Sequence, residues 1–293
     1  MMISTKRSFP ALIILGLIVL LTLLHILHSQ PACAPSRKLL LLNIVTVADK
    51  FDRRTLLRNF YSKTTPYAFV DVKYVIGKPN NTTPELLFKL QLEQIAHGDL
   101  TLLDSVENMN DGKTWDMISR SIKDGKVTGQ TYDFVGKGDD DAFIHLPNLV
   151  ERVLTLPKKS AYFGRFYDGW FMAGMMYLLS WDLATEISQH TALNKTGNED
   201  MKVAEWMNEL NIGEHRISEE NEMYDHPDSG ALWAHPYTPK TITIHMAKSD
   251  ALMTSAMQHF YDSMQKFEKP ELSACQKRQR RQWMKTFGYK ILE

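Results

Sequence analysis

Three consecutive carboxylates, Asp139, Asp140 and Asp141, lie between the apolar stretch YDFV and the apolar pair Phe143–Ile144. On an extended backbone Asp139 and Asp141 would point to one side and Asp140 to the other. Two carboxylates that face one cleft repel each other and lose hydration. A divalent cation removes both costs, and hard oxygen ligands suit Mg²⁺ or Mn²⁺. The triplet therefore indicates either a metal site or a solvated turn or helix cap, where Asp is also common.

A second acidic pair, Glu199–Asp200, directly precedes the helix-like stretch MKVAEWMNEL. A metal bound to Asp139 and Asp141 would bridge the diphosphate of a nucleotide-sugar and stabilise the charge that develops as it leaves. The acceptor hydroxyl that attacks the sugar then needs a general base, which a separate carboxylate can supply. Stabilisation of a helix N-terminus is the alternative role for Glu199 and Asp200, and spacing alone favours it.

The elements that must position these carboxylates alternate along the chain between apolar strands and segments with helical spacing. In order they are strand 39–47, helix 51–62, strand 72–76, helix 84–95, strand 100–103, helix 111–122 and strand 132–135. This alternation predicts an α/β layered domain with a mostly parallel sheet. Ligands bind such sheets outside the carboxyl ends of the strands, and the acidic triplet follows the last of these strands.

Charge and cysteine content narrow the possible functions. The 293 residues contain 34 Lys and Arg against 34 Asp and Glu, so net charge gives no argument for a nucleic-acid binder. The basic stretch KRQRRQW (277–283) reads first as a solvated helix face and second as a binder of an anionic lipid or polymer. Cys33 and Cys275 form no disulfide framework, and their pairing, with each other or through Cys33 between chains, stays open.

The N-terminal stretch FPALIILGLIVLLTLLHIL (9–27) has the length and apolarity of a membrane-spanning helix. Lys6 and Arg7 precede it, so the short tail is expected in the cytosol and the rest of the chain on the lumenal side. A cleaved signal peptide is the alternative, because Ala32-Cys33-Ala34 resembles a cleavage site. The expected organisation is a cytosolic tail (1–8), a transmembrane signal-anchor (9–28), a short stem (29–38) and a lumenal catalytic domain (39–293).

Three N-x-[ST] sequons fit a secretory compartment. Their acceptor residues are Asn80, Asn81 and Asn194, and each is an expected glycosylation site.

Seven short motifs occur in an order that resembles the β-1,3-galactosyltransferase family, glycosyltransferase family 31. They are RTLLRNFY (54–61), VIG (75–77), Glu93 with GDL (98–100), ENMN with KT (107–114), KGDDD (137–141), AGMMYLLS (173–180) and EDM (199–201). Departures include Phe60 and Tyr61 in place of the family's Thr and Trp, and His97 in place of Tyr. Met175 and Met176 replace glycines, which leaves the donor open between galactose, the first choice, and N-acetylglucosamine.

The resemblance implies a single-domain GT-A fold, Mn²⁺, a UDP-sugar donor and inversion at the anomeric carbon. It further implies that Asp139 and Asp141 bind the metal, that Asp200 is the general base and that Glu199 supports it. A later histidine completes the metal site in related enzymes, and His245 is the best placed candidate because it ends the alternating strand-like stretch TITIH. His145 is the second choice, with a helix start as its other interpretation.

The same resemblance suggests the residues that contact the donor. Asp140 would contact the sugar or ribose and Lys248 the diphosphate, while Lys113, Arg54 and Gly174 would complete the donor site. Although Gly112-Lys113-Thr114 resembles the end of a nucleotide-binding P-loop, Glu107 stands where that motif requires glycine.

The expected function is therefore a type II Golgi membrane enzyme that transfers a hexose from a UDP-sugar to an acceptor glycan hydroxyl with a β-1,3 linkage. The expected partners are the donor, a glycan, glycoprotein or glycolipid acceptor, the membrane and a second copy of the chain in a homodimer, but no nucleic acid. One alternative is a catalytically inactive relative that acts as a lumenal binding or chaperone-like subunit. A metal-dependent hydrolase that uses the same aspartates is the other.

Overall fold

The computed structural model describes residues 37–64 and 69–265 of the chain. Outside these ranges lie the expected cytosolic tail (1–8), the expected membrane helix (9–28), nearly all of the expected stem, both cysteines and the basic stretch at 277–283. Within the described ranges, no helix has both the length and the apolar character needed to cross a bilayer.

A seven-stranded sheet forms the centre of the described domain, with the strand order β3-β2-β1-β4-β7-β6-β8. Its strands are β1 (Lys38–Thr46), β2 (Val70–Lys78), β3 (Leu100–Val106), β4 (Tyr132–Asp139), β6 (Ala161–Tyr167), β7 (Phe171–Ser180) and β8 (His215–Ser218). β3, β2, β1 and β4 are parallel to one another, β7 is antiparallel to both β4 and β6, and β8 is parallel to β6. The expected mostly parallel α/β sheet is confirmed.

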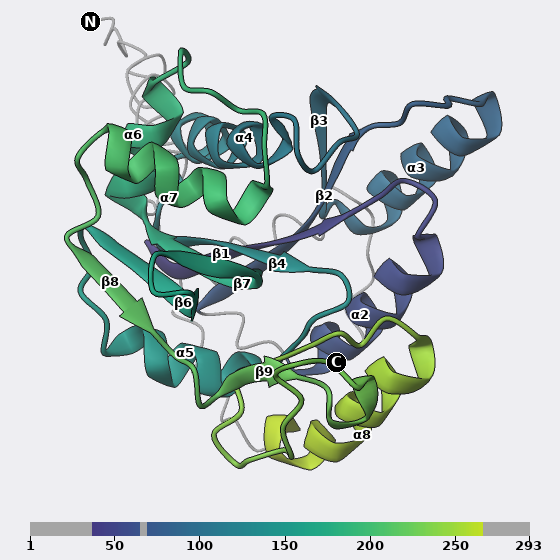
Figure 1. The fold of residues 1–293 in the computed structure, drawn as a ribbon. Helices are drawn as coiled ribbons and strands as arrows, with labels where there is room; N and C mark the ends of the chain where they lie inside the picture. The colour runs from purple at the N-terminus through teal and green to yellow at the C-terminus, as the bar shows by residue number, and fades with distance from the viewer. Residues whose placement is uncertain (1–36, 65–68, 266–293) are drawn as a thin grey trace, which may run out of the picture. The chain divides into compact units, whose positions relative to one another are not determined.

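Helices cover both faces of this sheet (Figure 1). On one face lie α4 (Lys113–Thr128), α6 (Trp181–Gln189) and α7 (Glu199–Glu209); on the other lie α2 (Phe51–Thr64), α5 (Leu146–Leu154) and α8 (Asp250–Gln265). Two apolar clusters correspond to these two interfaces. Because both of its faces are covered, β1 is built almost entirely from buried apolar residues, as is typical of a central parallel strand.

A smaller three-stranded sheet lies beside the carboxyl end of β4. It has the order β5-β10-β9 and consists of β5 (Phe143–Ile144), β9 (Met223–Asp225) and β10 (Thr243–His245). β5 follows the acidic triplet directly and pairs with β10, so residues separated by a hundred positions meet at this corner. A short 3₁₀ helix (Pro227–Ser229) begins the long connection from β9 to β10.

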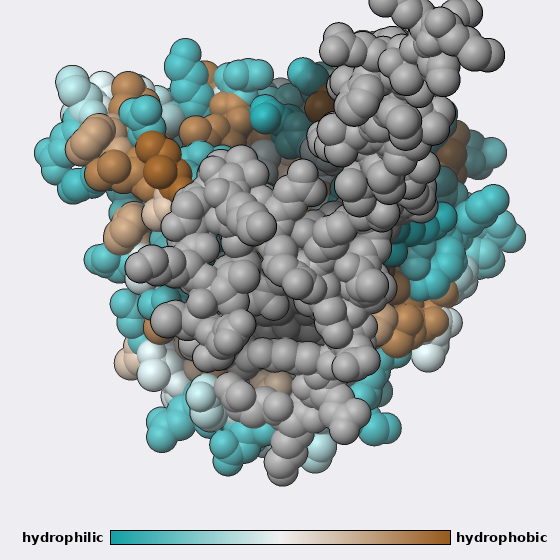
Figure 2. Space-filling view, turned by 180° about the vertical axis from the view of Figure 1, so that it is seen from behind, coloured by the Kyte–Doolittle hydropathy of each residue, from teal (hydrophilic) through white to brown (hydrophobic). Residues whose placement is uncertain are grey.

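Helix α3 (Pro84–His97) is apolar on two sides. Thr83 caps its start by accepting a hydrogen bond from the Leu86 amide, and Gly98 ends it in the left-handed conformation. Leu90 packs into the core, whereas the outward side is exposed and carries Leu87, Phe88, Leu92 and Ile95. Figure 2, seen from behind, shows hydrophobic side chains at the upper left, on the side where this helix lies.

Candidate active site

The acidic triplet begins at the last residue of β4, at the carboxyl edge of the sheet. Asp139 ends the strand, and a tight turn in which the Ala142 amide donates to the Asp139 carbonyl (3.1 Å) leads into β5. One oxygen each of Asp139 and Asp141 and one nitrogen of His245 all lie within 4.8 Å of one another. The structure therefore brings together the three side chains that were expected to form the metal site.

These three ligand atoms have the spacing that a shared cation requires. His245 Nε2 lies 3.5 Å from an oxygen of Asp141 and 3.9 Å from an oxygen of Asp139. Ligands bound about 2.1 Å from one octahedral ion stand roughly 3–4 Å apart. Two carboxylates and one imidazole also form a donor set that suits Mn²⁺. The residues present thus fit a divalent cation.

Asp225, which the sequence analysis did not identify, orients the histidine. Its Oδ1 lies 3.1 Å from His245 Nδ1, which leaves Nε2 directed at the two aspartates. A carboxylate behind a ligating histidine is a common outer partner in metal sites. Burial disfavours the imidazolium, yet the neighbouring carboxylates of Asp141, Asp139 and Asp225 raise the pKa of His245 above its usual value. A proton or a cation is therefore favoured at this position.

Lys137 connects the metal-binding aspartates with the second acidic pair. Its ammonium is only 1% exposed and donates to Asp139 Oδ1 (2.7 Å), to Glu199 Oε2 (3.1 Å) and to the carbonyl of Gly174. Burial opposes the charged form, but Asp139 and Glu199 outweigh it and raise the pKa of Lys137. A buried lysine with two carboxylate partners holds both of them in fixed positions.

Glu199 and Asp200 occupy different environments at the start of α7. Glu199 is buried and accepts from Tyr177 Oη (2.5 Å) as well as from Lys137, so both of its oxygens are engaged. Asp200 is half-buried and lines the open cavity. The N-cap is Asn198, so neither acidic residue occupies the capping position itself. Burial and the negative charge of Glu199 raise the pKa of Asp200, which brings it closer to that of an effective general base.

A cavity of about 420 Å³ joins these groups. Asp139, His245, Lys137 and Asp200 all line it. Gly174 forms part of its wall, where an added Cβ would lie 3.2 Å from Lys137 Nζ and 3.7 Å from Asp200 Cβ. The absence of a side chain at Gly174 therefore leaves room beside Lys137 and the candidate base.

The Asp140 carboxylate lies apart from the trio of Asp139, Asp141 and His245, as expected, although Asp140 stands in the turn after β4 and not on an extended strand. The Asp140 carboxylate accepts from Thr46 Oγ1 (2.6 Å) and Lys50 Nζ (3.0 Å). Lys248 is exposed, and together with Lys50 and Asp141 it lines a neighbouring cavity of about 420 Å³. Carboxylates outnumber cations in the lining of this cavity, and Lys50 pairs with Asp140 and Arg53 with Asp250, so Lys248 is the cation of this lining that none of these pairs involves.

Arg54 and Lys113 do not line either cavity, which corrects the expectation that they contact the donor. Arg54 is 0% exposed; it forms a two-pronged ion pair with Glu93 and donates to the carbonyls of Val47 and Ala48. These bonds satisfy its guanidinium inside the protein and hold the loop after β1. Arg54 is therefore a support of that loop.

Lys113 is equally buried. Its ammonium donates to the Thr46 carbonyl (2.7 Å) and to Glu107 Oε1 (2.5 Å). The other oxygen of Glu107 accepts from the Gly77 amide (2.8 Å). Burial lowers the pKa of Lys113 despite the nearby Glu107 carboxylate. This lysine joins the ends of β1 and β2 to the start of α4.

Two other expectations concern histidine and asparagine side chains. His145 is the N-cap of α5, where its Nδ1 accepts from the Asn148 amide (3.2 Å), so the structure supports the helix-start interpretation over metal binding.

The sequon residues Asn80, Asn81 and Asn194 are all exposed, as a glycosylation site requires, and their modification stays a prediction.

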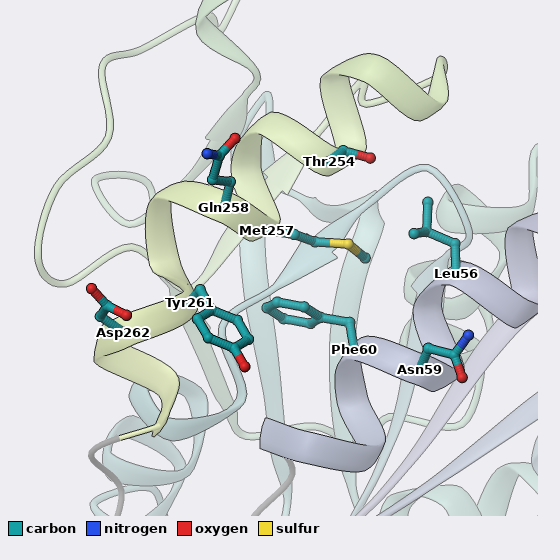
Figure 3. A pocket seen from close by; sticks show the side chains of 8 residues that line it. All are labelled: Leu56, Asn59, Phe60, Thr254, Met257, Gln258, Tyr261 and Asp262. Atoms are coloured by element: carbon teal, nitrogen blue, oxygen red, sulfur yellow. The ribbon is translucent and has the colours of Figure 1, made fainter.

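A further cavity of about 700 Å³ lies between α2 and α8 (Figure 3). Apolar side chains, among them Leu56, Met257 and Tyr261, dominate its lining. It shares no lining residue with the cavity that contains Asp200. The clustered carboxylates therefore distinguish the site at the end of β4 as the candidate active site.

No protein-family model matches the chain. The beta-1,3-galactosyltransferase pvg3 of Schizosaccharomyces pombe is 28% identical to it over 209 residues, which cover 51% of this chain and 55% of that protein. The human lactosylceramide 1,3-N-acetyl-beta-D-glucosaminyltransferase is 25% identical over 158 residues, which cover 50% of this chain and 40% of that protein. The chain thus aligns with about half the length of the curated relatives it matches, and it resembles β-1,3-glycosyltransferases in sequence.

Several solved structures are loosely similar. One is a glycosyltransferase involved in glycosylation of the major capsid of PBCV-1, with a TM-score of 0.41 and 12% identity over 75% of this chain and 99% of that one. Another is the mannosyltransferase PcManGT of Pyrobaculum calidifontis in complex with GDP-Man and Mn²⁺, with a TM-score of 0.44 and 14% identity over 80% of this chain and 66% of that one.

Proposed function

We propose that the chain is a metal-dependent, inverting glycosyltransferase that moves a hexose from a UDP-sugar to an acceptor hydroxyl. The observation that carries this proposal is the shared cavity, with Asp139 and His245 of the metal-binding trio and the separate carboxylate of Asp200 in its wall. The sequence similarity to a β-1,3-galactosyltransferase and a 1,3-N-acetylglucosaminyltransferase supports this reaction class. Galactose is our first choice of donor sugar, N-acetylglucosamine the second, and a β-1,3 bond the proposed product linkage.

Asp139, Asp141 and His245 would hold the cation, which when bound supplies positive charge to the departing diphosphate. Lys137 holds the Asp139 carboxylate in place at 2.7 Å, and Lys248 adds charge from the adjacent cavity. Asp140, whose carboxylate accepts hydrogen bonds from Thr46 and Lys50, would form part of the wall of the adjacent cavity beside the donor. The donor's sugar ring would lie beside Gly174, where no side chain obstructs it.

Asp200 would accept the proton of the attacking hydroxyl. Inversion requires that this hydroxyl approach the anomeric carbon from the side opposite the leaving diphosphate, so base and metal must lie at different ends of one cavity. Glu199 keeps its own oxygens on Lys137 and Tyr177 and therefore positions the start of α7. Its charge also raises the pKa of Asp200. Asp200 would thus accept the proton, and Glu199 would hold the start of α7 in position.

We further propose that the protein acts as a single-pass type II protein of the Golgi membrane, with residues 39–293 as its lumenal catalytic domain. The apolar stretch at 9–27, the two preceding cations and the three exposed sequon asparagines support this location. Detection of the full chain by antibodies before and after selective permeabilisation of the plasma membrane would test it. Accessibility of the C-terminus without permeabilisation of the Golgi would contradict it.

The activity is tested with the full-length chain purified in detergent. UDP release from UDP-galactose and UDP-N-acetylglucosamine is measured with Mn²⁺, with EDTA and with sugar acceptors. We expect turnover that disappears with EDTA and in Asp141→Ala. Failure of the wild-type protein to bind UDP with Mn²⁺ or to turn over either donor would favour the inactive binding subunit. Turnover of substrates that contain no sugar nucleotide would favour the hydrolase.

A further inference from the structure

Two aromatic side chains, Tyr167 and Trp233, form part of the wall of the cavity that contains Asp200. Tyr167 is the last residue of β6, and Trp233 lies in the connection between β9 and β10. Their ring centroids are 5.4 Å apart, with an angle of 65° between the ring planes. Tyr167 is 43% exposed and Trp233 is half-buried, so part of the surface of each ring is accessible in the cavity that Asp200 also lines.

Trp233 is fixed by the same carboxylate that orients the candidate metal ligand. The main-chain amide of Trp233 donates to Asp225 Oδ2 (3.1 Å), and the Asp225 amide donates to the Trp233 carbonyl (3.0 Å). The other oxygen of Asp225 lies 3.1 Å from His245 Nδ1. Arg165 stacks on the indole with its guanidinium carbon 4.5 Å from the ring centroid, and Met223 holds that guanidinium through its carbonyl.

Tyr167 is fixed by the hairpin between β6 and β7. Its ring stacks on Phe171, its partner across the hairpin, with centroids 5.2 Å apart and an interplanar angle of 27°. Phe171 is buried, and Asp168 (φ 50°) and Gly169 (φ 75°) close the turn in the left-handed conformation. A turn of this kind gives the hairpin a defined end and holds Tyr167 at its tip.

We propose that Tyr167 and Trp233 bind a sugar ring of the acceptor glycan that the family resemblance leads us to expect. This inference rests on the proposed function. An acceptor hydroxyl that reaches Asp200 must be part of a molecule that occupies the adjacent wall. The C–H face of a pyranose packs well on an aromatic ring, and rigid aromatic side chains lose little conformational entropy on binding. A peptide acceptor would instead use main-chain hydrogen bonds along a strand edge or a groove.

The positions of the rings favour the acceptor over the donor. The proposed function puts the donor sugar beside Gly174, where an added Cβ would lie 3.2 Å from Lys137 Nζ and 3.7 Å from Asp200 Cβ. The ring of Tyr167 stacks on the ring of Phe171. Phe171 precedes Gly174 by three positions on β7, so their Cα atoms are about 10 Å apart along the strand. Tyr167 thus lies at the hairpin end of the cavity wall, about 10 Å along the strand from Gly174, although both residues line the same cavity.

The test uses the full-length chain with UDP-galactose, Mn²⁺ and three probe acceptors: methyl β-galactoside, methyl β-N-acetylglucosaminide and methyl α-mannoside. The variants are Trp233→Ala and Tyr167→Ala, with Trp233→Phe as the conservative change. Tyr261→Ala is the matched control, because Tyr261 is 47% exposed but lines the separate cavity between α2 and α8 (Figure 3). Trp233 uses only its main-chain amide and carbonyl in the two hydrogen bonds with Asp225, so Trp233→Ala keeps both bonds.

We expect each alanine variant to raise the KM for the best probe acceptor about tenfold, the size of one lost aromatic contact. The donor KM and the slow UDP release without acceptor should stay at the wild-type level. Trp233→Phe should retain much of the acceptor affinity, and Tyr261→Ala all of it. Far-UV circular dichroism melts of every variant verify that the fold is intact.

Each contrary result has its own meaning. An unchanged acceptor KM in both alanine variants would overturn the assignment, and so would a rise in donor KM without a change in acceptor KM. Donor hydrolysis by the wild type without transfer to any methyl glycoside, but with transfer to a Ser/Thr peptide, would overturn the carbohydrate acceptor. A wild type that neither binds nor hydrolyses UDP-galactose or UDP-N-acetylglucosamine would instead overturn the proposed function, and this inference with it.

Discussion

Replacement of Lys137 by methionine should destabilise the protein strongly, because this lysine neutralises two carboxylates inside the domain. Its ammonium lies 2.7 Å from Asp139 and 3.1 Å from Glu199 and is 1% exposed, so solvent screens the pair with Glu199 (8% exposed) little and the pair with Asp139 (29% exposed) somewhat more. Removal of one member of a buried ion pair typically costs about 3–5 kcal/mol, because the partner charge stays buried without compensation. For a domain of this size, that corresponds to a fall in Tm of roughly 6–20 °C.

The measurement is a thermal melt followed by circular dichroism in the presence of EDTA, so that no cation replaces the missing charge. Lys89→Met is the matched control, because Lys89 pairs with Glu85 on the exposed side of α3 and should change the Tm little. The double variant Lys137→Met/Glu199→Gln should recover part of the loss, since it removes one of the two stranded charges. Contacting residues are expected to show such non-additivity.

Two results would refute the reasoning about Lys137. The first is a fall in Tm no larger than that of Lys89→Met, which would mean that water or a relaxed geometry compensates the carboxylates. The second is strict additivity of Lys137→Met and Glu199→Gln, which would mean that the 3.1 Å contact carries no coupling.

Three further outcomes are expected. Asp200→Asn should leave UDP binding intact, measured by calorimetry with Mn²⁺, but reduce transfer by about 10²–10⁴-fold, the usual contribution of a general base; unchanged transfer would reassign the base. Asp225→Asn should weaken Mn²⁺ binding by about 10–100-fold in a titration, as loss of an outer partner of a metal-binding histidine commonly does. Burial lowers the pKa of His145 to about 4 from its usual 6.5. Its contribution to stability is therefore complete above pH 6.5 and is lost as pH falls toward 4, by about 2 kcal/mol at pH 5. Urea unfolding at pH 7.5 and pH 5 should show this loss in the wild type, whereas an equal loss in His145→Gln would contradict it.

The local signals in the sequence identified the first three helices and the first four strands of the described domain. The alternation of apolar stretches with helical spacing placed α2 and α3 within two residues of their observed bounds, whereas α4 continues six residues past its expected end. It did not reveal that β7 runs antiparallel to β4 and β6, because the pairing of strands depends on contacts between distant segments. Nor did it reveal the three-stranded sheet, whose strands are only two or three residues long.

The grouping of the acidic triplet was predictable, but not for the reason expected. An extended backbone would separate Asp139 and Asp141 from Asp140; the structure keeps that separation, although β4 ends at Asp139 and a turn carries Asp140 and Asp141. Arg54 and Lys113 were expected at the donor because the family motifs suggested it, yet the side chains of both bind carboxylates and carbonyls inside the protein. A lysine inside the strand sequence YDFVGKGD was a signal that could have identified Lys137, since a buried cation demands carboxylate partners.

The bonds of Lys113 make the carboxyl edge of the sheet a single unit of local opening. The Thr46 carbonyl, Glu107 and, through Glu107, the Gly77 amide all depend on this one ammonium. Hydrogen exchange at the end of β1, the end of β2 and the loop around residue 107 should therefore share one opening free energy. Cooperative opening of this kind would expose the loops at the carboxyl edge of the sheet together and not one at a time.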